Sequence, residues 1–91
     1  MLTQSGITQD GMVVIRGVFR IFETDGLPLD VIFDVLRERN YIPDWEGFVL
    51  EAEAAGMNRN RILLKLDAAI ADTYGTEMRD IVIKRIHRIF K

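Results

Sequence analysis

Cysteine is absent from this 91-residue chain, and histidine and serine occur only once each. Without thiols the chain can form neither disulfide bonds nor thiolate-bound zinc sites. The one histidine, His87, lies close to the C-terminus between Ile86 and Arg88, and Ser5 belongs to the N-terminal segment. No pair of nucleophile and general base is therefore suggested. We predict that the protein is not an enzyme.

Long apolar runs and ligand-binding motifs are also missing. No apolar stretch approaches the ~20 residues that span a bilayer, and the N-terminal residues lack the pattern of a signal peptide. Neither a calcium-binding acidic loop nor a phosphate-binding glycine loop is present. The sequence therefore predicts a soluble, cytoplasmic protein that needs no metal or cofactor, binds no membrane and takes no small-molecule substrate.

Hydrophobic residues are plentiful for so short a chain. They make up 48% of the sequence, which is ample for a core and argues against disorder. Ninety-one residues correspond to one domain, so we expect a single helical domain over residues 1–91, with residues 1–7 as a flexible tail. A small domain this rich in apolar residues also leaves apolar surface uncovered. We therefore expect self-association or docking on a protein partner.

Apolar residues recur at helical spacing in five segments, each bounded by turn residues. The expected helices run from Thr8 or Asp10 to Glu23, then over 28–39, 44–55, 58–74 and from 76 onward. The first segment also fits the two-residue period of a strand, but no later segment offers a convincing partner strand. We therefore predict an all-α fold, a compact bundle of about five short helices joined by short turns.

Local signals at the ends of these helices support their bounds. Asp44 and Asn58 precede the third and fourth helices and are good N-caps. Asn40 follows the second helix and tolerates the left-handed conformation that ends it. Thr76 is expected to cap the last helix.

Charge is divided unevenly along the chain. Residues 1–57 contain four basic and ten acidic residues, whereas residues 58–91 contain eight basic and four acidic ones. The overall charge of −2 thus hides an acidic first part and a basic second part. Because the local field attracts partners more than the net charge does, the basic part is expected to contact something acidic.

The junction between the third and fourth expected helices resembles the DNA-binding helix-turn-helix pattern over about twenty residues. Ala52 supplies the small residue, Gly56 the turn and Ile62 the apolar residue that follows, with Met57 inside the turn. The next helix opens with residues 58–61, Asn-Arg-Asn-Arg, which are types that pair with base edges or hold phosphates.

Two residues depart from that pattern. Glu51 stands where an apolar residue is expected, and Lys65 stands where the recognition helix buries an aliphatic one. A glycine-containing turn between two packed helices, without any contact to DNA, explains the same residues. Both interpretations are open at this stage.

The last expected helix carries a basic face. Basic residues near a helix C-terminus complement its dipole, so this face is either solvated or holds phosphates or an acidic partner. Arg79 would join it as a phosphate contact. The candidate contacts for nucleic acid or an acidic partner are Asn58, Arg59, Asn60, Arg61, Lys65, Lys84, Arg85 and Arg88.

The first hypothesis from the sequence is a non-catalytic protein–protein adaptor or assembly component. It is based on the hydrophobicity, the opposed charges and the lack of a catalytic set. The alternative is a DNA-binding helix-turn-helix protein whose recognition helix begins at Asn58. An adaptor predicts an exposed apolar surface around Tyr41–Trp45 or the first helix, whereas DNA binding requires an exposed start of the fourth helix.

Overall fold

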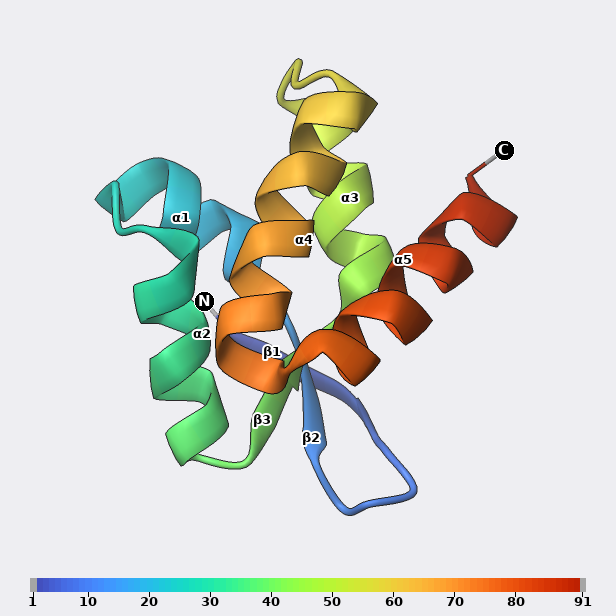
Figure 1. Ribbon diagram of the computed structural model, residues 1–91. Coiled ribbons are helices and arrows are strands. Elements are labelled where there is room, and N and C mark those ends of the chain that lie inside the picture. The colour runs from blue at the N-terminus through green and yellow to red at the C-terminus, as the bar shows by residue number, and fades with distance from the viewer. Residues whose placement is uncertain (1, 91) are drawn as a thin grey trace.

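The computed structural model describes residues 2–90, and its fold is α+β, so the all-α prediction is wrong. Five helices accompany a three-stranded sheet in this part of the chain (Figure 1). The elements in chain order are β1 (Thr3–Ile7), β2 (Val13–Arg16), α1 (Val18–Asp25), α2 (Leu29–Glu38), β3 (Tyr41–Pro43), α3 (Trp45–Ala54), α4 (Arg59–Tyr74) and α5 (Thr76–Ile89).

Most of the error lies in the first 23 residues. The expected first helix is divided at Gly17, whose φ of +92° is a left-handed conformation that ends β2 and precedes α1. Thr3–Ile7, expected as a tail, form β1, and Met1 lies outside the described residues. Thr8, one of the two expected starts of the first helix, is instead in the hairpin turn, where its Oγ1 accepts a hydrogen bond from the Met12 backbone N–H.

The sheet has the order β1-β2-β3 and mixed direction. β1 and β2 form an antiparallel hairpin with an irregularity between Gln4 and Gly6. β2 and β3 are parallel, with Val13 opposite Tyr41. The missing partner strand is therefore β3, which has only three residues and ends in Pro43, so that it carries no periodic signal of its own.

The four later helices agree with the sequence prediction within a few residues. Asp44 caps α3 by accepting a hydrogen bond from the Gly47 N–H at 3.3 Å, and Asn58 caps α4. Asn40 has a φ of +61°, as its place after α2 predicted. Thr76 is not a cap, because Gly75 occupies the N-cap position of α5 and no side chain caps that helix.

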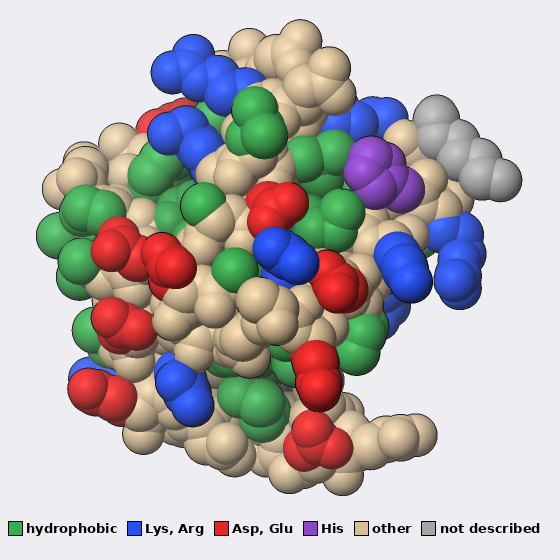
Figure 2. Space-filling model, in the orientation of Figure 1, with side chains coloured by type: hydrophobic (Ala, Val, Ile, Leu, Met, Phe, Trp, Pro, Cys, Tyr) green, Lys and Arg blue, Asp and Glu red, His purple; other side chains and the backbone are tan. Residues whose placement is uncertain are grey.

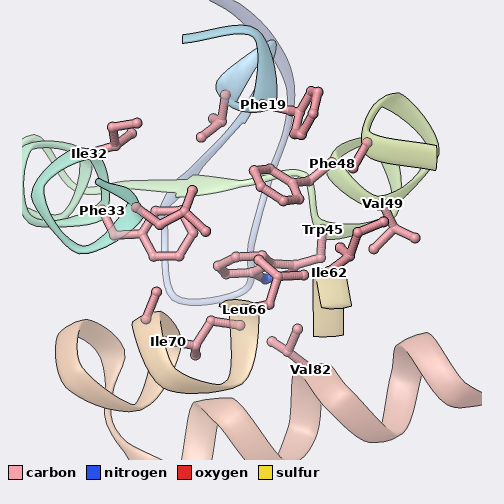
Figure 3. Close-up of a cluster of buried hydrophobic side chains, with 14 of the residues drawn as sticks. Phe19, Ile32, Phe33, Trp45, Phe48, Val49, Ile62, Leu66, Ile70 and Val82 are labelled. Atoms are coloured by element: carbon pink, nitrogen blue, oxygen red, sulfur yellow. The ribbon is translucent and has the colours of Figure 1, made fainter. Parts of the chain in front are cut away.

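The core lies among β2, β3 and the helices, and aromatic rings fill its centre (Figure 3). Phe33 of α2 is fully buried and meets the edge of Trp45 at 5.5 Å between ring centroids. Tyr74 packs against both rings, and its hydroxyl donates a hydrogen bond to the Tyr41 carbonyl at 3.0 Å. Burial raises the pKa of Tyr74 well above its usual range.

α4 lies between α2 and α5 and packs against both (Figure 1). α5 runs back beside α4, so that the end of α5 returns to the start of α4, while the β1–β2 hairpin projects from the opposite end of the molecule. Among residues 2–90, no helix combines the length and the apolar character needed to cross a bilayer.

Candidate functional site

The turn between α3 and α4 has the compact form that the sequence predicted. Gly56 has a φ of +94°, a conformation that favours glycine. The Met57 N–H donates a hydrogen bond to the Ala52 carbonyl, and the Met57 side chain is half-buried. Ala52 is fully buried, as a close approach of the two helices requires. This turn fixes where the first side chains of α4 lie.

Arg59 is held by the protein itself. Its Nε and Nη2 donate hydrogen bonds to the two carboxylate oxygens of Glu53, at 3.1 and 3.2 Å. Its Nη1 donates to the Phe90 carbonyl, and its guanidinium lies 5.3 Å from the centre of the Phe90 ring. The start of α4, the end of α3 and the end of α5 are thereby joined. Arg59 is consequently committed to intramolecular contacts.

The remaining polar residues at the start of α4 divide into two kinds. Asn58 is engaged, because its Oδ1 accepts a hydrogen bond from the Asn60 N–H at 2.9 Å. The others are exposed. Lys65 lies over the Phe22 ring, 5.6 Å from its centre, and the exposed fraction of Leu64 is 72%. We name these exposed residues the α4 start surface, and it comprises Asn60, Arg61, Leu64 and Lys65.

The basic residues of α5 lie apart from that surface. Lys84, Arg85 and Arg88 are exposed, and Arg85 pairs with Glu46 of α3 at 2.9 Å. Figure 2 shows basic side chains in separate groups, one over the start of α4 and another along α5. The eight candidate contacts therefore do not form one continuous patch.

Arg79 is paired with two carboxylates. It pairs with Asp80 at 2.9 Å and with Asp67 of α4 at 3.5 Å. The hydrogen bond to Asp80 and the charge of Asp80 raise the pKa of Arg79 above its usual value. Arg79 thus ties α5 to α4, and the predicted phosphate contact at this position has two carboxylate competitors.

A groove that sequence reasoning missed lies between the β1–β2 hairpin and α5. Its volume is about 490 Å³, and apolar side chains of both walls and of the Ile42–Trp45 segment line it. Asp10, Asp44 and Glu46 stand among its polar lining residues. The apolar residues of the groove are Met12, Val14, Ile42, Pro43, Trp45, Met78, Ile81 and Val82. The hairpin had no place in an all-helical interpretation, and the exposed apolar surface expected around Tyr41–Trp45 is not found, because Ile42, Pro43 and Trp45 are buried.

Groups suited to chemistry are sparse in the described chain. Between residues 2 and 90, no cluster of three or more His, Cys, Asp or Glu side chains is placed to hold a metal ion. His87 is exposed on α5.

Comparison with known proteins gives a partial match. Alanine–tRNA ligases resemble this chain. That of Pseudomonas fluorescens is 40% identical over 62 residues, which cover 57% of this chain and 7% of the ligase. That of Neisseria gonorrhoeae is 40% identical over 53 residues, covering 58% of this chain and 6% of the ligase. The chain thus spans less than a tenth of the length of these relatives.

Neither other comparison adds a relative. No family model matches the chain. No solved structure matches it at a significant level. The partial likeness concerns enzymes, but it covers a small segment of each and carries no information on catalysis by this chain.

Proposed function

We propose that this protein is a non-catalytic RNA-binding module and that it binds transfer RNA through the α4 start surface. The observation that carries the proposal is the likeness of more than half of the chain to proteins whose name gives tRNA as a substrate. The exposed basic start of α4 supplies a surface that suits such a ligand.

The residue types of the α4 start surface fit RNA. Arg61 and Lys65 can contact phosphates, which provide most of the affinity for a nucleic acid. Asn60 can donate to and accept from a base edge or a ribose 2′-hydroxyl, which distinguishes RNA from DNA. Leu64 is exposed enough to lie against a ribose or a base. The N-terminal end of the α4 dipole adds a partial positive charge to the same place.

Sequence-specific reading of DNA by the same helix has less support. In the helix-turn-helix hypothesis, residues 58–61 supply the base contacts, but Asn58 caps α4 and Arg59 is bound to Glu53 and Phe90. Two of these four residues are therefore already engaged in contacts within the protein. Recognition of an RNA by its shape and backbone needs fewer free side chains, so the remaining residues suffice for it.

Fluorescence anisotropy with labelled RNA tests this proposal. The probes are an alanine tRNA transcript, a second tRNA and a mixed-sequence DNA duplex. Each is titrated at several salt concentrations from about 50 to 200 mM. We expect micromolar binding to tRNA that weakens with salt, and weaker binding to the duplex. The Arg61→Ala/Lys65→Ala variant should lose affinity and show a salt slope shallower by about one to two, because each lost phosphate contact removes about 0.7–0.9 from the slope.

Arg39→Ala provides the matched control, because Arg39 is exposed at the end of α2, outside the α4 start surface. It should bind tRNA as the unaltered protein does. Absence of tRNA binding at low salt would contradict the proposal. Equal losses in the control and in the α4 variant would place the contact elsewhere, and tighter binding to the duplex would favour the DNA hypothesis.

A second candidate function is the protein–protein adaptor that the composition predicted. The groove between the β1–β2 hairpin and α5 favours it, because it is mainly apolar and includes the 42–45 segment. In the ligases the similar segment belongs to a far longer chain, so it has neighbours there that a groove of this kind could receive. An apolar segment of such a ligase is the corresponding partner.

Biolayer interferometry with the Pseudomonas fluorescens ligase tests the adaptor proposal. Met78→Gln changes a half-buried wall of the groove and should weaken binding by roughly tenfold, since an interface contact of this size contributes on the order of 1 kcal/mol. Leu50→Gln is the control, because Leu50 is exposed on α3 and does not line the groove. Binding that is absent, or that both variants reduce equally, would count against this role.

A further inference from the structure

We propose that copies of this chain associate head to tail, the outer face of α2 in one copy docking on the outer face of α5 in the next. The proposal goes beyond tRNA binding and uses none of the residues of the α4 start surface. It depends on two exposed helix faces that match in apolar content and are opposite in charge.

The α2 face is acidic with an apolar centre. Val31 and Val35 are 43% and 44% exposed, although the opposite side of the helix is buried in the core. Arg37, the one basic residue of α2, turns away to donate a hydrogen bond to the Thr73 carbonyl at 2.8 Å, so it stays bound to α4. We define the α2 face by its exposed residues, which are Asp30, Val31, Asp34, Val35 and Glu38.

The α5 face is basic with apolar residues beside the charges. Ile81 and Ile89 are 64% and 45% exposed, while Val82 and Ile86 on the opposite side of α5 face the core. No acidic residue occurs in α5 from Ile81 onward. We define the α5 face by its exposed residues, which are Ile81, Lys84, Arg85, Arg88 and Ile89.

The two faces complement each other. Each contains two aliphatic side chains and three charged ones of opposite sign, and Lys84 and Arg88 carry the charge of the α5 face, since Arg85 is paired with Glu46. Two α2 faces would repel each other, and so would two α5 faces, because like charges meet in both cases. A second copy of this chain is therefore the partner that both faces fit.

The placement of the helices determines the kind of assembly. α4 lies between α2 and α5, so the two faces point away from each other on opposite sides of the molecule (Figure 1). Figure 2 shows the same separation, with acidic side chains prominent on the α2 side and basic ones along α5. A contact between two different faces is heterologous, and it adds further copies until a ring closes or a filament grows.

Sedimentation velocity over a range of protein concentrations tests this assembly. The unaltered protein should form species larger than a dimer as its concentration rises, and salt should weaken them because the charges at the face edges are exposed. Asp30→Lys/Asp34→Lys makes the α2 face basic, and Lys84→Glu/Arg88→Glu makes the α5 face acidic. Each variant alone should be monomeric, because its two faces now have the same sign.

An equimolar mixture of the two variants is the decisive measurement. The α5 face of the first variant then meets its native partner, the α2 face of the second, and the two altered faces are complementary as well. The mixture should therefore regain the large species. Glu23→Lys and Arg20→Glu, which change exposed charges outside both faces, should associate as the unaltered protein does.

Three results would overturn the proposal. They are an unaltered protein that is monomeric at every concentration in low salt, a mixture of reversed variants that stays monomeric while circular dichroism shows both to be folded, and an assembly that stops at a dimer. Each measurement uses the full chain, and restoration in the mixture excludes misfolding as the cause of the losses in the single variants.

Discussion

Arg59 and Glu53 face each other across the turn between α3 and α4, and both carboxylate oxygens of Glu53 accept hydrogen bonds from the one guanidinium. The third contact of Arg59, to the Phe90 carbonyl, brings the end of α5 into the same joint. The single side chain thus links three helices that follow one another in sequence.

Replacing Arg59 by alanine should destabilise the protein moderately. The two side chains are 37% and 30% exposed, so solvent screens the pair and its contribution is expected near ~1 kcal/mol. Urea unfolding of Arg59→Ala, Glu53→Ala and the double variant measures the coupling. Strict additivity of the two losses would show that the pair contributes nothing. The tRNA affinity of Arg59→Ala should fall less than that of Arg61→Ala, because only Arg61 is free.

Gly75→Ala should lower the free energy of unfolding, although the surroundings of Gly75 leave room for a side chain. Gly75 has φ +96° and ψ 164°, a region that is essentially restricted to glycine. An added Cβ would meet no atom within 4 Å, so the expected loss of about 1–3 kcal/mol comes from the backbone alone. Gly6→Ala is the control, since it has equal space and no positive φ. Thermal unfolding of both variants should separate them, and similar midpoints would contradict the argument.

Alkaline pH should destabilise the fold through Tyr74. Burial raises its pKa in the folded state, so this group contributes stability that is fully present below the unfolded pKa of about 10 and is lost as pH rises above it. Urea unfolding between about pH 8 and 11 measures the slope. Tyr74→Phe should flatten that slope and cost ~1 kcal/mol at neutral pH, because it removes the hydrogen bond to Tyr41. An unchanged slope in the variant would assign the pH dependence to other groups.

Truncation of the central aromatic residue should lower the free energy of unfolding strongly. Phe33 is fully buried beneath Trp45 and Tyr74, so Phe33→Ala should cost about 3–5 kcal/mol. A domain of this length has a total stability of roughly 5–14 kcal/mol. Leu64→Ala, at an exposed position, should change stability by less than ~0.5 kcal/mol. Guanidinium unfolding compares the two, and equal effects would be inconsistent with the core described above.

Local sequence signals were sufficient for the last four helices. α2 through α5 have apolar stripes at helical spacing, and Asp44, Asn58 and Asn40 mark their ends by known side-chain and backbone preferences. The same logic failed for the sheet because its information is not local. β1 has no fully buried residue and so no alternating pattern, and the partner of β2 is a three-residue strand beyond two helices.

The candidate sites show the same division. The turn around Gly56 has the form that the sequence predicted, and Arg61 and Lys65 lie exposed near the start of α4, while their role as contacts stays a prediction. Sequence reasoning could not foresee that Arg59 would be bound to Phe90, 31 residues away, or that the hairpin would form one wall of a groove. Contacts between distant segments depend on the packed fold and not on spacing.

The parallel pairing of β2 and β3 has a consequence for how the chain folds. Val13 and Tyr41 pair although 28 residues separate them in sequence, with α1 and α2 in between. Closing so long a loop costs chain entropy before any hydrogen bond of the pair forms, whereas α4 and α5 adjoin across Gly75 and meet through nearby residues. We therefore expect amide hydrogens of α4 and α5 to become protected first during refolding, and those that join β2 to β3 last.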